Sequence, residues 1–250
     1  MKVIFNGDDF GLTKGVSKGI IEAIKKGVLS DTTAMVNSPY FEDSIRYAKE
    51  NDITSLGLHL TLTNRKPVLP PSLVKSLVDE NGDFFKSVSK LPCNINIDEF
   101  EKEMRAQVNK FLGCGLELNH IDGHHHFFMF YPELLDIVIK LSKELNVPLR
   151  SGTTSIKLLC NKENIKTTDF TDSFYKDGAT IENLISILNK HKDSNSILEF
   201  MMHPGYSDEE LRSLSSYNDF REEELKILTS TRLKDYIKSN NIEIINFSQL

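Results

Sequence analysis

Short apolar segments alternate with amphipathic helical segments along most of the chain. Residues 3–6 are mostly apolar and predict a buried strand, and the helically spaced apolar side chains between 16 and 24 predict a helix that ends near Gly27. The same two patterns predict further strands at 32–37, 55–63, 116–122, 197–202 and 242–247, and further helices at 41–51, 98–112, 132–145, 180–190 and 231–239. This alternation indicates a parallel sheet with helical crossovers.

The segment 55–63 shows the clearest strand pattern. Leucine occupies every second position from 56 to 62, while Gly57, His59 and Thr61 lie on the other face, which looks functional. We expect the leucines to pack outward against helices and His59 to face the interior of a barrel. The next segment, 64–97, contains four prolines and an Asn-Gly turn that break the rhythm. It predicts a long excursion, a lid or an interface, rather than a separate domain.

Two architectures fit this alternation, a barrel and an open doubly wound sheet. Neither a GxGxxG nor a Walker motif follows the first strand, so no motif supports nucleotide binding. Candidate functional residues follow several strands between residues 8 and 203, and in barrels such residues gather at the carboxyl ends of the strands. We therefore predict a single catalytic α/β domain over residues 1–250 with a TIM-barrel-like fold.

Composition and charge exclude some functions. The net charge of −6, from 30 Lys and Arg against 36 Asp and Glu, argues against a nucleic-acid-binding surface and a polybasic membrane anchor. No apolar run approaches the roughly 18 residues of a membrane span, and the first residues do not resemble a signal peptide. The three cysteines form no CxxC pair, so we expect a cytoplasmic protein without a disulfide framework.

Three short polar sites follow predicted strands. Asp8 and Asp9 come directly after the first strand, where one carboxylate can bind a cation while its neighbour faces a substrate; the alternative is an ordinary turn or helix start. His59 is either a ligand or a hydrogen-bonded packing residue. His203 ends a strand just before a Pro-Gly turn, which suits proton transfer near neutral pH, although a purely structural role is equally open.

The densest polar signal is the segment 120–126, which contains four of the chain's seven histidines. His120, Asp122, His124 and His126 share the same parity, so a strand that continued through them would point all four side chains one way. Neutral imidazoles are good ligands for zinc and other first-row metals, and a nearby carboxylate often orients them. The alternative is a polar loop or a His-rich surface tract.

Together these sites indicate more than each does alone. An Asp and two His can form a three-ligand metal site that leaves positions open for water and substrate, which is typical of catalytic rather than structural sites. The remaining Asp and the remote His then supply a base and an acid. The residues by themselves therefore predict metal-assisted hydrolysis, without naming the substrate.

Four segments, taken in order, resemble the YdjC-like family of carbohydrate deacetylases, which includes chitooligosaccharide deacetylases. They are NGDDFGLT at 6–13, GLHLTLT at 57–63, HIDGHHH at 120–126 and HPGY at 203–206. The resemblance covers nearly the whole chain and implies a distorted (β/α) barrel. It also implies a hydrolase that removes acetyl groups from amino sugars or chitobiose-type oligosaccharides.

The resemblance further implies residue roles. One divalent cation would be held by Asp9, His59 and His124, with Asp8 as the general base and His203 as the acid or oxyanion partner. Three more residues are expected to contact the substrate, of which the first matches a position where family members carry an arginine near the site: Arg150, His126 and Asp122. Family resemblance suggests magnesium, whereas two imidazoles and a carboxylate also suit zinc or another transition metal.

Two positions depart from the family pattern, and two rival functions stay open. Many members have Ala where this chain has Gly7, a change that is expected to matter little. Many also have a further His where this chain has Phe128, which affects the expected substrate contacts near that residue rather than the metal set. The rivals are another metal-dependent amidohydrolase or phosphoesterase on the same barrel, and a non-catalytic sugar-binding protein. The second is disfavoured because a binder needs no base beside the metal. A homodimer is a further expectation, from the apolar run 127–130 and the proline-rich excursion.

Overall fold

The computed structural model describes residues 1–192 and 194–250, apart from the side chain of residue 173. Within these residues seven parallel strands form one sheet in the order β4-β3-β2-β1-β6-β5, with β7 beside the start of β1. The strands are β1 (Lys2–Phe10), β2 (Asp31–Ala34), β3 (Ser55–Leu60), β4 (Glu117–Gly123), β5 (Phe170–Ser173), β6 (Ile197–Met202) and β7 (Glu243–Ile244). The predicted α/β class with a parallel sheet is confirmed.

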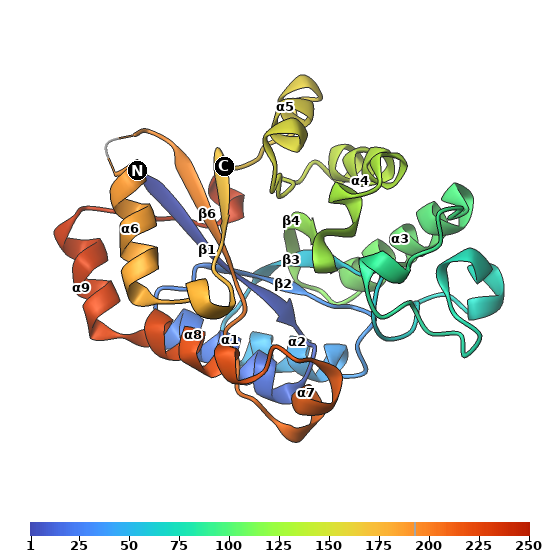
Figure 1. Ribbon diagram of the computed structural model, residues 1–250, viewed down its shortest axis with the longest axis horizontal. Coiled ribbons are helices and arrows are strands. Elements are labelled where there is room, and N and C mark those ends of the chain that lie inside the picture. The colour runs from blue at the N-terminus through green and yellow to red at the C-terminus, as the bar shows by residue number, and fades with distance from the viewer. Residues whose placement is uncertain (193) are drawn as a thin grey trace.

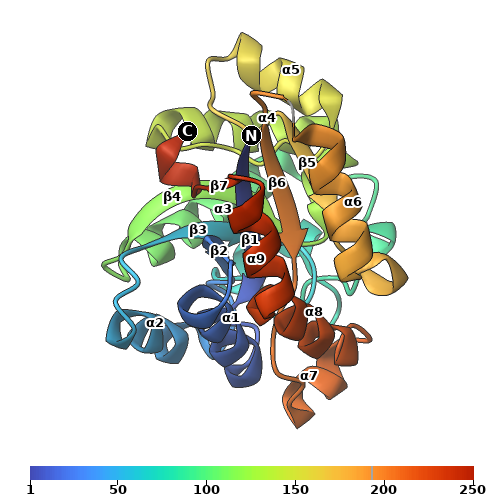
Figure 2. The ribbon, with the colours of Figure 1, turned by 90° about the vertical axis from the view of Figure 1, so that its left-hand side faces the viewer.

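Helices surround the strands, as Figures 1 and 2 show from two directions. They are α1 (Lys14–Lys26), α2 (Phe41–Glu50), α3 (Ile97–Leu112), α4 (Pro132–Leu145), α5 (Thr154–Lys162), α6 (Ile181–His191), α7 (Glu209–Leu214), α8 (Asp219–Thr229) and α9 (Thr231–Ser239). Neighbouring helices pack in pairs around the sheet: α2 with α1, α1 with α8, α8 with α9, α9 with α6, and α3 with α4. No helix in the described ranges is long and apolar enough to cross a membrane.

The two edge strands of the sheet, β4 and β5, are linked through a short extended segment. Leu149 pairs with Ile121 of β4 in a parallel bridge, and its N–H donates to the carbonyl of Lys166, shortly before β5 begins. These links curl the sheet towards closure. The arrangement agrees with the expected distorted barrel, in which one position of the ring is occupied by an irregular segment instead of a full strand.

Several boundaries differ from the sequence prediction. Strand β2 ends at Ala34 rather than at 37, and the last predicted strand is reduced to β7 followed by a 3₁₀ turn. Helix α3 is capped by Asn96, whose side chain accepts from the N–H of Glu99. Four elements were not predicted: β5 and α7 are short, and α5 and α8 have a weaker apolar period than the helices that were predicted.

The excursion 64–97 is packed rather than loose, and follows β3 beside α3 (teal to green in Figure 1). It contains short 3₁₀ turns and an antiparallel bridge between Val78 and Phe84, and its apolar side chains, such as Leu77 and Phe84, join the main core. The buried carboxylate of Glu103 in α3 accepts from the N–H groups of Val68 and Leu69. The excursion is therefore anchored to the barrel by both apolar and charged contacts.

The core explains two sequence patterns. The leucines of the 55–63 segment are all buried in the main cluster, on the face opposite His59. Phe127 and Phe128 are also buried core residues, and only Phe130 at the end of that run is strongly exposed. Phe127 and Phe128 therefore offer no surface to a partner, and the homodimer expected from this run and from the excursion stays a prediction.

Candidate active site

The predicted ionisable residues gather at the carboxyl ends of the strands. Asp8 and Asp9 lie near the end of β1 rather than after it. His59 is in β3, His124 directly follows β4, and His203 directly follows β6. The strands are parallel, so these ends lie at one edge of the sheet. The register of β1 shifts between Gly7 and Phe10, and Asp9 adopts a positive φ of 72°. This irregularity lets two adjacent carboxylates line the same pocket.

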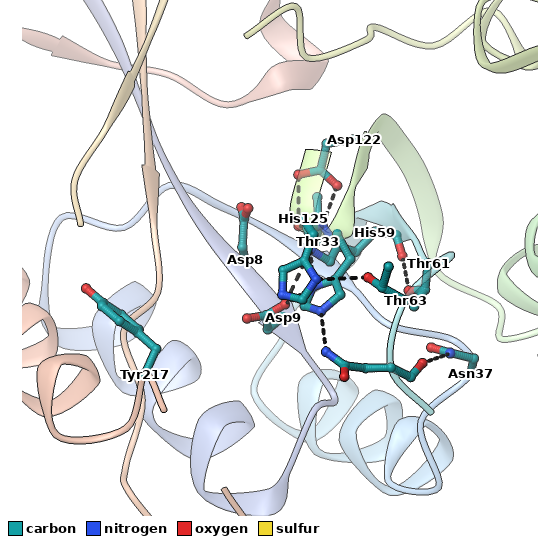
Figure 3. Close-up of polar contacts among 12 residues, drawn as sticks. Asp8, Asp9, Thr33, Asn37, His59, Thr61, Thr63, Asp122, His125 and Tyr217 are labelled. Atoms are coloured by element: carbon teal, nitrogen blue, oxygen red, sulfur yellow. Dashed lines mark hydrogen bonds and ion pairs between the residues drawn. The ribbon is translucent and has the colours of Figure 1, made fainter. Parts of the chain in front are cut away.

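Three side-chain atoms of Asp9, His59 and His124 converge, and Figure 3 shows Asp9 beside His59. The Oδ1 atom of Asp9 lies 3.3 Å from Nε2 of His59 and 3.0 Å from Nδ1 of His124, and the two ring nitrogens are 3.3 Å apart. Ligand atoms about 2.1 Å from one cation lie about 3.0 Å apart at right angles and about 3.4 Å apart at the tetrahedral angle. The buried Oδ1 atom of Asp9 has no hydrogen-bond donor among the described residues. The trio therefore fits a divalent cation.

Further residues orient two members of this trio. The guanidinium of Arg221 in α8 donates to Oδ2 of Asp9 at 2.5 Å, which leaves Oδ1 free to face the two histidines. Asp122 lies 2.7 Å from Nδ1 of His59 and accepts from Thr33. A carboxylate on Nδ1 fixes the tautomer that presents the Nε2 lone pair to the trio. Burial would raise the pKa of Asp9, but Arg221 and His124 hold it well below its ordinary value.

Asp8 is held by a different partner. Arg150 donates to Oδ2 of Asp8 through Nη1 and to Oδ1 through Nη2, both at 2.7 Å, and the side-chain amide of Asn6 also donates to Oδ1. Burial acts to raise the pKa of Asp8, but the facing guanidinium outweighs it and lowers this pKa below its ordinary value. The carboxylate therefore stays ionised at neutral pH, and one of its oxygens lies within 4.8 Å of a nitrogen of His59.

Arg150 connects Asp8 to two further carboxylates. Its guanidinium also pairs with Asp122 at 2.7 Å and with Glu199 of β6 at 2.6 Å. Arg150 and Asp122 are fully buried and do not line the pocket, so their geometry favours positioning roles over contact with a substrate. Asp8, His59 and Asp122 form a second group with suitable spacing for a cation, but Arg150 already forms an ion pair with both of its carboxylates.

The four histidines of the segment 120–126 lie in different environments. Strand β4 ends at Gly123, and His125 and His126 have positive φ values of 54° and 52°, so the predicted shared parity is wrong beyond Asp122. His120 is fully buried and stacks on Phe247 with 3.7 Å between ring centroids, away from the trio. Only His124 of the four histidines joins the trio, whereas His126 lines the pocket.

His203 lines the pocket next to an aromatic pair. Its backbone N–H donates to Glu224 at 2.6 Å, and the same carboxyl group accepts from the hydroxyl of Tyr217. Tyr217 stacks on Tyr175, and both rings meet His203 edge to face. Burial lowers the pKa of His203 to about 4, so its imidazole is neutral at pH 7, and burial raises the pKa of Glu224 to about 8.

One pocket of about 600 Å³ contains these groups. Small-molecule sites usually have volumes of about 300–1,000 Å³. Asp8, Asp9 and the trio histidines line it. Its other walls come from the excursion, the loop after β4, the segment after β5, and the end of α7 with the residues that follow it, including Asn64, Arg65, Ser87, Val88, Ser89, Phe130, Tyr175, Leu214, Ser215, Ser216 and Tyr217. The pocket therefore combines ionised groups with hydroxyl and aromatic side chains.

Sequence reasoning missed four residues that contact this site. Glu199 was detectable, because it is a carboxylate in the middle of an otherwise apolar strand. A buried carboxylate of this kind needs a basic side chain as its partner. Arg221 and Glu224 lie three positions apart on one face of α8, a helix that was not predicted. Asn64 begins the excursion and lies 3.4 Å from Nε2 of His124. Nothing in its local pattern distinguishes it.

A curled parallel α/β sheet that brings an Asp-His-His trio and a separate ionised aspartate into one pocket is the arrangement of the α/β-barrel hydrolase class. The chain belongs to the YdjC-like protein family, whose sequence model matches residues 2–239. The family inferred from the four motifs is therefore confirmed.

Similar proteins carry the name expected from the motifs. Carbohydrate deacetylase 1 of Listeria innocua serovar 6a is 39% identical over 254 residues, and the carbohydrate deacetylase of Brevibacillus brevis is 40% identical over 255 residues, with 100% of both chains covered in each pair. A crystal structure from Enterococcus faecalis V583, described as that of a candidate cellobiose-phosphate cleavage protein, is 35% identical with a TM-score of 0.93. It covers 99% of this chain and 98% of its own.

Proposed function

We propose that this protein is a metal-dependent carbohydrate deacetylase that removes N-acetyl groups from amino sugars or short chitobiose-type oligosaccharides. The observation that carries the proposal is the convergence of Asp9 Oδ1, His59 Nε2 and His124 Nδ1 at 3.0–3.3 Å beside the ionised Asp8. The full-length similarity to carbohydrate deacetylases supports the substrate class. A pocket with hydroxyl and aromatic walls also suits a sugar, which presents both polar groups and apolar ring faces.

Asp9, His59 and His124 would hold one divalent cation. When bound, such a cation lowers the pKa of a water molecule and polarises an acyl oxygen. Family resemblance favours magnesium, while the imidazole ligands also suit zinc or another transition metal. Arg221 and Asp122 keep the ligand atoms of Asp9 and His59 turned inward, so that these side chains need little reorganisation.

Asp8 acts as the general base in this proposal. Arg150 and Asn6 fix its carboxylate in one orientation, and the lowered pKa keeps it ready to accept a proton from the attacking water at neutral pH. The same ion pair limits how strongly Asp8 retains the proton, which helps its later release. Arg150 and Asp122 thus take positioning roles, and His126 remains a candidate for contact with the substrate at the pocket wall.

His203 supplies the second functional group. As a neutral imidazole it can donate an N–H hydrogen bond to the developing oxyanion. As an acid it would receive the proton that Asp8 takes from the attacking water and pass that proton to the departing sugar amine. Glu224 positions the backbone of His203 through its N–H, and its own contact with Tyr217 connects this support to the aromatic side of the pocket.

The test is acetate release from N-acetylglucosamine oligomers by protein treated with a chelator, with Mg²⁺, Zn²⁺, Mn²⁺ or Co²⁺ added back singly. We expect the chelated protein to be inactive and one or more cations to restore release. A parallel panel of phosphate esters tests the phosphoesterase alternative. Acetate release that is unaffected by chelation would remove the metal from the proposal, and no release with any cation would remove the deacetylase activity.

A cytoplasmic location also belongs to the proposal, in keeping with the free thiols of Cys93, Cys114 and Cys160.

A further inference from the structure

Each residue of the Asp9–His59–His124 trio has a polar partner behind it, and the third partner comes from outside the barrel strands. Arg221 contacts Oδ2 of Asp9, and Asp122 contacts Nδ1 of His59. The third contact joins the side-chain amide of Asn64, the first residue of the excursion 64–97, to Nε2 of His124 at 3.4 Å. The excursion therefore meets the trio directly at one atom.

The tautomer of His124 decides what this contact must be. Its Nδ1 atom points at Asp9 Oδ1 and His59 Nε2, so Nδ1 is the nitrogen that would give its lone pair to a cation. A neutral imidazole then carries its proton on Nε2 and needs an acceptor there. An asparagine amide can turn by 180° to exchange its nitrogen and oxygen. Asn64 would therefore present Oδ1 to the Nε2–H of His124.

The backbone around Asn64 is fixed in an uncommon conformation. Asn64 and Arg65 have positive φ values of 63° and 64°, two consecutive non-glycine residues in the left-handed region. The side-chain amide of Asn37 donates to the backbone carbonyl of Asn64 at 3.5 Å and to that of Lys66 at 3.1 Å. Arg65 in turn donates to the carbonyl of Leu12 at 2.9 Å. These contacts fix the backbone that carries the Asn64 side chain. Figure 3 shows Asn37 at the outer end of this chain of contacts.

A second contact joins the same stretch of chain to the neighbouring imidazole of His125. The hydroxyl of Thr63 lies 2.9 Å from Nδ1 of His125, whose ring stacks on that of His124 with 3.9 Å between centroids. Thr63 and Asn64 thus each contact a ring nitrogen of one of two stacked imidazoles, and Figure 3 shows Thr63 beside His125. A contact made only to pack the excursion would not need an amide aimed at the nitrogen opposite the ligand atom.

We propose that Asn64 is a positioning residue that accepts a hydrogen bond from Nε2–H of His124, fixes the ligand tautomer of that histidine, and makes the affinity of the site for a divalent cation depend on the excursion. The inference rests on the metal site proposed above. It assigns to the excursion a role in metal binding, in addition to its place in the pocket wall.

The test compares two variants with a matched control. Asn64→Gly removes the amide without strain, because glycine adopts a positive φ freely, whereas Asn64→Asp keeps an acceptor at the same position. Asn81→Gly makes the same substitution on an exposed part of the same excursion. Dissociation constants for Zn²⁺ and Mg²⁺ are measured separately on the full chain, by competition with a chromophoric chelator and by calorimetry. We expect Asn64→Gly to bind 10- to 100-fold more weakly, as is typical for loss of a group that orients a ligand, and the other two variants to stay within about threefold of wild type.

A second readout observes the tautomer of His124 directly. In ¹⁵N-histidine-labelled wild-type protein loaded with zinc, the side-chain spectrum should show His124 protonated at Nε2, and this proton should exchange with solvent faster in Asn64→Gly. Protonation at Nδ1 in the zinc-loaded wild type would overturn the inference, as would equal zinc affinity of Asn64→Gly and wild type. If the wild type binds no divalent cation, the proposed metal site itself fails, which is a separate outcome.

Discussion

Arg150 donates to both carboxylate oxygens of Asp8, at 2.7 Å each, across 142 residues of sequence. The same guanidinium contacts Asp122, which in turn contacts the trio residue His59. The proposed base and the proposed metal ligands are therefore parts of one buried hydrogen-bonded network. In such a network a change at one member alters the geometry of the others.

The first prediction concerns Arg150 itself. Arg150→Lys keeps a positive charge but cannot form the planar, two-bond contact with Asp8. Loss of one charge-assisted hydrogen bond costs about 1.5–3 kcal/mol, so we expect the turnover number for acetate release to fall roughly 10- to 150-fold. Arg150→Met should also lower the free energy of unfolding by about 3–5 kcal/mol, because it leaves buried carboxylates without a counter-charge. Wild-type turnover in Arg150→Lys would show that the two-bond contact with Asp8 is not needed.

The second prediction separates the two adjacent aspartates. Asp8→Asn should retain the cation but lose about 10²- to 10⁴-fold in turnover, the usual contribution of a general base. Alanine at Asp9, His59 or His124 should instead abolish both bound metal and activity, because each substitution removes one of the three proposed protein ligands.

Metal content by mass spectrometry and acetate release together distinguish these outcomes. His191→Ala is the matched control for the histidine variants, since His191 ends α6 and does not line the pocket. Near-normal deacetylation by Asp8→Asn would refute the base assignment, and full metal content in Asp9→Ala would refute the ligand assignment.

The sequence was most informative where one residue type has a strong local meaning. Alternating leucines predicted β3 and its buried second face, and a histidine before a Pro-Gly turn predicted that His203 follows a strand at the pocket. Motif resemblance then identified the family and proposed which of the clustered histidines joins the trio. Helix α5 was missed because its apolar period is weaker than that of α9, which has the same length. Strand β5 was missed because only the first of its four residues is apolar.

The charged network could not be derived in the same way, since it depends on tertiary pairing. Glu199 becomes interpretable only when β6 lies beside β1, which brings it to Arg150. Arg221 reaches Asp9 from a helix 212 residues later in the chain. The parity argument for 120–126 failed for a local reason, because the chain leaves β4 at Gly123 and turns through two left-handed residues.

The third prediction distinguishes the two roles proposed for His203. His203→Ala should lower turnover on an acetylated amino sugar by about 10²- to 10³-fold, whichever role the imidazole has. The comparison is with an activated ester such as 4-nitrophenyl acetate, whose leaving group needs no proton. A proton donor should then matter little, so the loss on the ester should be about tenfold or less, whereas an oxyanion partner should cause similar losses on both substrates. Full activity of the variant on both substrates would exclude His203 from the reaction.

The fourth prediction concerns Glu224 and pH. Burial raises the pKa of Glu224 in the folded protein to about 8, from an ordinary value of 4.5. Between these values the folded protein retains a proton that the unfolded chain releases, so the stability contributed by this group is complete below about pH 4.5 and is lost as the pH rises through about 8. Glu224→Gln cannot lose a proton and can still contact both Tyr217 and the N–H of His203, because the tyrosine hydroxyl can reverse its direction.

Urea unfolding of Glu224→Gln and wild type at pH 5, 6.5 and 8 measures this effect. We expect the free energy of unfolding of the variant, relative to wild type, to rise with pH by up to about 1.4 kcal/mol per pH unit. Glu223→Gln is the matched control, because Glu223 is exposed on the same helix and pairs with Lys226, so its difference from wild type should not follow this trend. A constant difference between Glu224→Gln and wild type from pH 5 to 8 would mean that the buried carboxyl is already ionised. Arg221 and the hydroxyl of Tyr217 would then stabilise that charge more than burial opposes it.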